Sequence, residues 1–278
     1  MTMIQEFSIY LSSVRGYSAN TIRAYRADLL AFCKWAKENI EGARWSTITR
    51  DDIDAYLEHQ VAKGLKATTT NRQLAAISAI YRYFQRQGLR VDNPCQYESR
   101  RKTPQTIPAT LSAAHIAKAY QRAHGVRKTL LGLLATTGAR IQELLDLKFE
   151  DIDFEENTLH IRGKGSKERI VRTDAEVLKT LRDIKTQLCA SGRIFYISQR
   201  HARYMVYDAL APYCKSKHLN PHTIRHTFAT ELAKAGVNCA AIARALGHSH
   251  LETSQKYINL AEISTAHQGI ILTKNSQK

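Results

Sequence analysis

Six residues of this 278-residue chain are of the types that could act together on a phosphate: two arginines, two histidines, a lysine and a tyrosine. They are Arg140 in TTGARIQELLDL, Lys164 in RGKGSKER, His222 and Arg225 in PHTIRHTF, His248 after Gly247, and Tyr257 nine residues further on. Guanidinium groups bind two phosphate oxygens at once and stay charged. Imidazole, amine and phenol groups can move protons or attack an electrophile. Together they are typical of a site that displaces one oxygen from a phosphate diester.

Tyr257 is the candidate nucleophile of this set. A phenol with a pKa near ~10 is mostly protonated at neutral pH, so it needs help to attack. The chain has 13 tyrosines, and only the spacing after Gly247-His248 distinguishes this one.

Arg140 and Arg225 are the candidate phosphate clamp. Donors held in place where negative charge develops contribute about 3–4 kcal/mol each to catalysis. Glu143 lies one turn after Arg140, so a salt bridge is the alternative explanation for that arginine. The two explanations are compatible if Glu143 orients Arg140.

The histidines and the lysine are candidates for moving protons. Either His222 or His248 could donate to a phosphoryl oxygen or take the tyrosine proton. Lys164 could protonate a leaving oxygen, although Lys167 and Arg169 compete for that role, and the GKG sequence does not have P-loop spacing. His226 follows His222 by four residues, which would suit zinc, but no HExxH glutamate or third ligand accompanies the pair. We therefore expect no metal and no cofactor.

Apolar residues at helical spacing divide the chain into two domains around these residues. Four amphipathic helices, with capping residues before them and glycines after them, predict an all-α domain over residues 1–103. Prolines and basic residues predict a linker at 104–109, followed by a second domain at 110–278. In the second domain the spacing of apolar residues shortens from the helical repeat to alternation at 158–162 and 169–172, which predicts a β-hairpin between helices. The expected fold is mainly α, with a small antiparallel sheet in the second domain.

The composition indicates an intracellular protein that binds a polyanion. Lys and Arg exceed Asp and Glu to give a net charge of +16, which points to nucleic acid, although a merely basic protein is the alternative. The five cysteines are scattered and include no CxxC, which argues against a disulfide framework. No secretory signal and no apolar run of about 20 residues is present. We expect a cytoplasmic protein without a membrane partner.

Two helix starts in the first domain are polar where a nucleic acid could lie. Short polar and basic side chains there can bind phosphates together with backbone N–H groups. Capping and ordinary surface exposure are the alternative for each single residue. The residues are Ser18, Asn20, Thr21, Arg23, Lys66, Thr69, Asn71 and Arg72.

In the types, order and spacing of these motifs, nearly the whole chain resembles the tyrosine recombinase (integrase) family, and most closely its Xer-like members. The resemblance implies a SAM-like, core-binding N-terminal domain and a catalytic C-terminal domain that together grip double-stranded DNA. It assigns catalysis to the six residues named above, with Tyr257 as nucleophile. It prefers Lys164 as the acid, which leaves Lys167 and Arg169 as contacts to the DNA backbone. It also implies that His226 supports the fold.

The same resemblance implies a site-specific strand exchange. Tyr257 would become bonded to a 3′ phosphate, a four-way Holliday junction would form, and four protomers would act on two sites without ATP or metal. A second recombinase or accessory proteins could take part, and the apolar tail after Tyr257 would dock on a neighbouring protomer. The alternatives are a type IB topoisomerase and a non-catalytic DNA-binding regulator.

Overall fold

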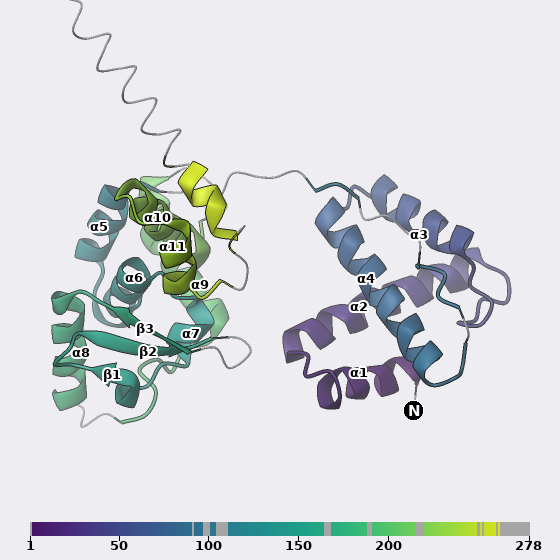
Figure 1. The fold of residues 1–278 in the computed structure, drawn as a ribbon, viewed down its shortest axis with the longest axis horizontal. Coiled ribbons are helices and arrows are strands. Elements are labelled where there is room, and N and C mark those ends of the chain that lie inside the picture. Colours follow the sequence, from purple (N-terminus) through teal and green to yellow (C-terminus); the bar gives the residue numbers. More distant parts are fainter. Residues whose placement is uncertain are drawn as a thin grey trace, which may run out of the picture. The chain divides into compact units, whose positions relative to one another are not determined.

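The computed structural model describes residues 2–90, 92–96, 101–103, 111–163, 168–187, 191–214, 219–248, 251, 253–259 and 261. The chain forms two compact units, Met1–Gln105 and Thr106–Lys278 (Figure 1). The predicted linker at 104–109, Lys164, Lys167 and the apolar tail beyond 261 lie outside the described residues.

The first unit is built from four helices, and its described part contains no strand. The long helices α2 and α4 pack against each other, and both α1 and α3 contact this pair. The apolar side chains of α4 recur every three or four residues and are buried, which explains why this helix forms the centre of the unit. The helices are α1 (Met3–Ser13), α2 (Ala19–Asn39), α3 (Arg50–Ala62) and α4 (Ala67–Arg86).

The second unit is mostly helical and carries one small sheet, which confirms the predicted fold class. None of the described helices in either unit is long and apolar enough to cross a bilayer. The elements are α5 (Ala113–Arg122), α6 (Gly125–Thr137), α7 (Ile141–Leu145), η1 (Phe149–Asp151), β1 (Ile152–Asp153), β2 (Thr158–Arg162), β3 (Glu168–Arg172), α8 (Ala175–Gln187), α9 (Gln199–Leu210), η2 (Ala211–Tyr213), α10 (Pro221–Lys234) and α11 (Cys239–Leu246).

The sheet has three antiparallel strands in the order β1-β2-β3. The predicted hairpin is present, with Leu159 opposite Val171 in the register of β2 and β3. The first strand, β1, was not predicted, because two residues are too short to show an alternating pattern. It pairs with β2, with Ile152 opposite Leu159, and so adds one strand to the sheet.

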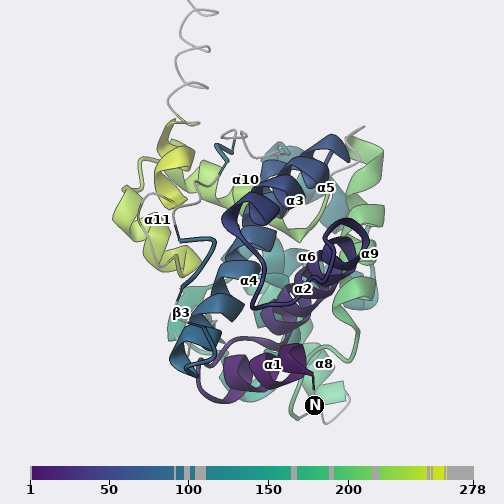
Figure 2. The same ribbon diagram turned by 90° about the vertical axis from the view of Figure 1, so that its right-hand side faces the viewer.

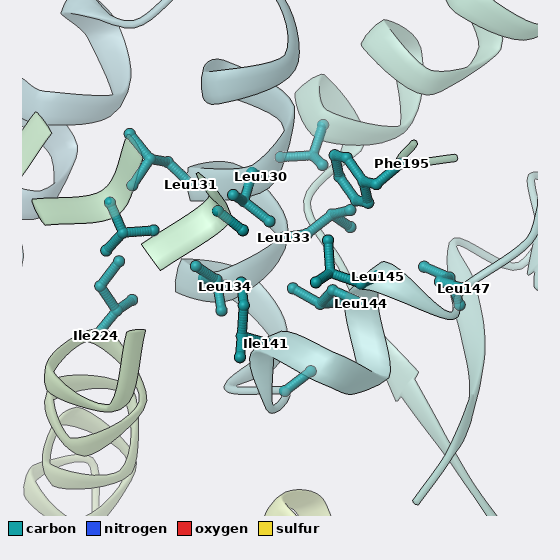
Figure 3. Packing of buried hydrophobic residues seen from close by; sticks show 14 of the residues in the cluster. Leu130, Leu131, Leu133, Leu134, Ile141, Leu144, Leu145, Leu147, Phe195 and Ile224 are labelled. Carbon is teal, nitrogen blue, oxygen red and sulfur yellow. The ribbon is translucent and has the colours of Figure 1, made fainter. Parts of the chain in front are cut away.

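The core of the second unit surrounds α6, whose four leucines are all completely buried (Figure 3). Residues 129–134 of α6 are all buried, so this part of the helix has to be covered on every side. Helix α7 and Ile224 of α10 lie against it. Arg140 immediately precedes α7, and Arg225 immediately follows Ile224, so this core fixes the backbone from which both arginines project.

Helix α11 lies next to strand β3 in this unit (Figures 1 and 2). This packing brings strand β3 of the hairpin to the C-terminal end of α11, where the Gly247-His248 motif begins.

Candidate active site

Arg225 is a buried arginine with 4% of its surface exposed. Its Nη1 donates to the carbonyl oxygen of Gly138 at 2.8 Å, and its Nη2 donates to that of Leu246 at 2.7 Å. Burial, with Arg140 nearby, lowers its pKa to about 10, so the group stays charged at neutral pH. A guanidinium has more N–H donors than these two bonds use, so Arg225 can also bind a substrate oxygen.

Both carbonyls bound by Arg225 lie at the ends of helices that stop at a glycine. Gly138 ends α6 with φ 59°, and Gly247 ends α11 with φ 66°, both in the left-handed region that favours glycine. A Cβ on Gly138 would come within 2.4 Å of the Phe228 ring. Carbonyl groups at a helix C-terminus have no intrahelical partner and carry partial negative charge, so they hold a guanidinium well.

Three consecutive carbonyls at the end of α11 each accept a hydrogen bond from a different arginine. Ala245 accepts from Arg169 at 2.9 Å, Leu246 from Arg225, and Gly247 from Arg140 at 3.3 Å. The end of α11 therefore collects three positive side chains from β3, α10 and the residue before α7.

Arg140 is the more accessible of the two clamp candidates, with a side chain 35% exposed. Its Nη1 donates to Oε1 of Glu143 at 2.8 Å, and its backbone N–H donates to Oε2 at 2.9 Å. Glu143 thus lies where the sequence suggested an orienting partner for Arg140.

Arg169 differs from the expectation that it contacts the DNA backbone. Its side chain is 10% exposed and its Nη2 donates to Oε2 of Glu143 at 2.7 Å. Burial would raise the pKa of Glu143, but hydrogen bonds from Arg169 and Arg140 more than offset this, so its pKa lies below the ordinary value. Glu143 therefore bridges two arginines, and Arg169 is held inside the protein by an ion pair that surface charge patterns do not reveal.

Tyr257 lies in the helical segment 253–259 and is 1% exposed. Its ring packs in a small apolar cluster with Ala229 and Ala233 of α10 and Ile242 of α11. Its phenol oxygen lies 2.8 Å from Nδ1 of His226. Burial raises the phenol pKa, and Arg225 partly offsets this, so the hydroxyl is protonated at neutral pH.

His226 is therefore in direct contact with the candidate nucleophile, although sequence reasoning left it outside the catalytic set. Burial, Lys256, His222 and Arg225 lower its pKa to about 4, so the ring is neutral at pH 7. The sequence feature that could have indicated this role is the position of His226 one turn after His222, on the same helix face. In the part of the chain that the structure describes, no group of three His, Cys, Asp or Glu side chains could hold a metal ion.

His248 and His222 are both close enough to Arg225 and Arg140 for those cations to lower their pKa values. The Nδ1 of His248 is 2.7 Å from Oγ of Ser254, and its ring centroid is 6.4 Å from that of Tyr257. Burial and Arg225 lower the pKa of His248 to about 4. His222 lies in the first turn of α10, where desolvation and Arg225 also lower its pKa. Five of the six candidates therefore meet, and the sixth, Lys164, is outside the described residues.

Two cations near the site were not identified from the sequence. The Nζ of Lys256 lies 5.1 Å from the centre of the Tyr257 ring, and burial followed by Arg225 lowers its pKa. Arg203 on α9 is close enough to His222 to help lower the pKa of that imidazole. Neither residue stands in a recognisable motif, so only the packing reveals them.

The polar residues at the helix starts of the first unit are exposed or partly exposed, and several of their side chains make hydrogen bonds within the protein. Ser18 caps α2 by accepting from the Thr21 N–H at 3.3 Å, and Arg23 donates to Asn20. Lys66 precedes α4 as its N-cap residue, and the Thr69 N–H donates to its carbonyl.

The other two candidate residues of α4, Asn71 and Arg72, make longer-range contacts. The Asn71 side chain bonds the backbone of Arg101, and Arg72 pairs with Asp28 of α2 at 2.7 Å. Arg72 also donates to the carbonyl of Ala24 at 3.4 Å, so the early part of α4 contacts α2 beyond its first turn.

The depressed histidine pKa values predict a loss of stability in mild acid. The folded pKa of His248, about 4, lies below the ordinary 6.5, so the unfolded chain takes up protons first as the pH falls. The stability present above pH 6.5 should be lost as the pH falls towards 4. Because the ring is only partly buried, we expect about 1 kcal/mol from this residue.

The measurement is the free energy of unfolding of wild type and of His248→Gln at several pH values. The wild type should lose more stability than the variant as the pH falls. Parallel curves would contradict the prediction, because all other titrating groups are common to both proteins.

Comparison with known proteins gives matches along most of the chain. The phage integrase family matches residues 100–263, and the phage integrase N-terminal SAM-like domain matches residues 4–88. Tyrosine recombinase XerD of Haemophilus influenzae is 31% identical over 269 residues, which cover 89% of this chain and 90% of that protein. Tyrosine recombinase XerD of Proteus mirabilis is 32% identical over 285 residues, covering 93% and 88%.

Among solved structures, a XerH site-specific recombinase bound to palindromic difH substrate in a post-cleavage complex matches with a TM-score of 0.76. Its identity is 19%, and the match covers 97% of this chain and 85% of that chain. At this identity the similarity shows a common fold.

Proposed function

Because the chain belongs to the phage integrase family and is a site-specific recombinase of the tyrosine type, we propose that it breaks and rejoins DNA through a covalent 3′-phosphotyrosine. Four protomers would act on two double-stranded DNA sites and pass through a Holliday junction. The observation that carries the proposal is the attachment of Arg140 and Arg225 to the end of α11, with Tyr257 and His248 beside them.

The geometry supports a defined division of roles. The Tyr257 oxygen would attack the phosphorus, forming the Oη–P bond and breaking the bond to the 5′ oxygen. Arg140 and Arg225 would stabilise the charge on the non-bridging oxygens, which peaks as phosphorus becomes five-coordinate. His222 and His248 would donate to the same oxygens, and Lys164 would protonate the leaving 5′ oxygen. The phosphotyrosine keeps the bond energy, so a different 5′ hydroxyl can later reseal the strand.

The DNA contacts proposed for the first unit lie at the starts of two helices, where N–H groups and short polar side chains can bind phosphates. They are Ser18, Asn20, Thr21 and Arg23 at the start of α2, and Lys66, Thr69, Asn71 and Arg72 at the start of α4. Lys167 remains a proposed backbone contact.

The function can be tested with DNA selected by the protein itself. Duplexes retained from a randomised pool would be cloned as two copies on a supercoiled plasmid and incubated with the protein and EDTA. We expect recombinant circles and protein bonded to DNA 3′ ends. Relaxation of a plasmid without the selected site would instead indicate a topoisomerase, and the absence of any adduct would indicate a non-catalytic regulator.

Arg169 provides a separate prediction within this function. Replacing Arg169 by lysine removes the fork that holds Glu143, so Arg140 loses part of its orientation. We expect the cleavage rate to fall about tenfold, which corresponds to about 1.4 kcal/mol, with DNA affinity and its salt dependence unchanged.

The measurements are single-turnover cleavage and binding at several salt concentrations. Arg172→Lys, at an exposed position on the same strand, is the matched control and should retain the wild-type rate. If Arg169 instead contacted DNA, its loss would weaken binding and reduce the salt slope by about one.

A further inference from the structure

The phenol proton of Tyr257 has to leave when its oxygen bonds to phosphorus, and neither histidine of the expected catalytic set, His222 or His248, is the one hydrogen-bonded to the phenol oxygen in the described residues. The Nδ1 of His248 is engaged with Ser254, and its ring lies 6.4 Å from the Tyr257 ring between centroids. Among the described histidines, His226 is the one with a recorded hydrogen bond to the phenol oxygen, at 2.8 Å.

We propose that His226 is the proton acceptor for Tyr257, and thus a catalytic residue that touches the reacting oxygen. The inference rests on the proposed function and assigns a step that the sequence motifs leave open between His222 and His248. In this step the Oη–P bond forms, the P–O5′ bond breaks, and the phenol proton moves to Nδ1 of His226. The leaving 5′ oxygen takes a separate proton from Lys164.

The surroundings of His226 suit this role. The ring is neutral because burial and nearby cations oppose its charging. The proposed step uses the tautomer that carries its proton on Nε2, in which the phenol donates its hydrogen to the unprotonated Nδ1. The groups that face it are His222 and Arg225 from its own helix, Lys256 and Tyr257 from segment 253–259, and His248.

The position of His226 is fixed by packing on both sides of the hydrogen bond. The His226 and Tyr257 ring centroids are 5.8 Å apart, and the carbonyl of His226 accepts from Thr230 within α10. Tyr257 is held by the apolar cluster of α10 and α11. The contact therefore joins two elements that sequence places 31 residues apart, and a change at either side alters the direction of the phenol.

Two substitutions separate proton transfer from positioning. His226→Ala removes both the hydrogen bond and the acceptor, whereas His226→Asn keeps an oxygen able to accept the hydrogen bond but unable to take the proton. His115→Ala is the matched control, because the His115 ring also lies against a tyrosine ring of the same unit, with 5.7 Å between the ring centroids.

The DNA substrate is a nicked duplex whose sequence is selected from the randomised pool by binding to the Tyr257→Phe variant. The experiment measures the single-turnover rate of adduct formation on this substrate over a range of pH, with and without added imidazole. We expect both His226 variants to be slower by about 10² to 10⁴, with normal DNA binding. Their rates should rise with pH more steeply than the wild-type rate, because hydroxide must then remove the proton. Imidazole should restore part of the rate of His226→Ala.

A wild-type rate in His226→Asn would overturn the inference, because the contact would then only position the phenol. A faster rate in His226→Ala would also overturn it, because the contact would then restrain the tyrosine. An unchanged pH profile without imidazole rescue would do the same. If the wild type itself forms no adduct, the proposed function fails and the inference fails with it. The three results on the His226 variants would overturn the inference alone and leave the proposed function standing.

Discussion

Replacing Tyr257 by phenylalanine should abolish covalent attachment to DNA while leaving DNA binding intact. The substitution removes only the oxygen that attacks phosphorus, and loss of a nucleophile of this kind reduces turnover by about 10⁶. The ring is buried in an apolar cluster that phenylalanine fills equally well. The lost hydrogen bond to His226 should change the stability by only about 1 kcal/mol.

The measurement is the yield of protein–DNA adduct after denaturation, with mobility shifts for binding. Tyr120→Phe is the matched control, since Tyr120 is another tyrosine of the second unit whose hydroxyl makes a hydrogen bond, to Glu176 at 3.3 Å. It should form adducts as the wild type does. An adduct formed by the Tyr257 variant would move the nucleophile to another residue.

Arg225→Lys should have the second largest effect, because it alters both the phosphate clamp and its support. A lysine keeps the charge but cannot bridge the carbonyls of Gly138 and Leu246 while also facing a phosphate. We expect cleavage to fall by about 10² to 10³. A carbonyl left without a partner costs about 1–3 kcal/mol of stability.

Cleavage rates should be corrected for the folded fraction, obtained from thermal unfolding of each variant. Arg182→Lys is the control, because Arg182 also donates to a backbone carbonyl, that of Phe154, but at an exposed position. A corrected Arg225→Lys rate equal to that of the control would show that this arginine supports the fold without contributing to the chemistry.

The agreement between sequence and structure was best where one local pattern is sufficient. The helices of the first unit follow from apolar spacing and capping residues, and the hairpin follows from a change of period. How Arg225 is held could not be predicted, because it depends on α6 and α11 ending at the same place.

The sequence was least informative where a side chain has two possible partners. Arg169 lies on a strand in a basic segment, which suggested a DNA contact, but the packing of β3 against α11 directs it to Glu143 and Ala245. A single strand pattern does not contain that information.

By itself, the sequence determined which chemical groups this protein has available, because residue types, order and spacing indicate a candidate nucleophile, a candidate clamp and candidate proton carriers. The tertiary structure decided which atoms meet. His222 and His226 share one helix face, and only the docking of segment 253–259 on α10 brings the phenol to the second of them. Which of the two histidines contacts the phenol depends on packing between elements that are distant in sequence, and it cannot be predicted from the spacing of residues along one helix.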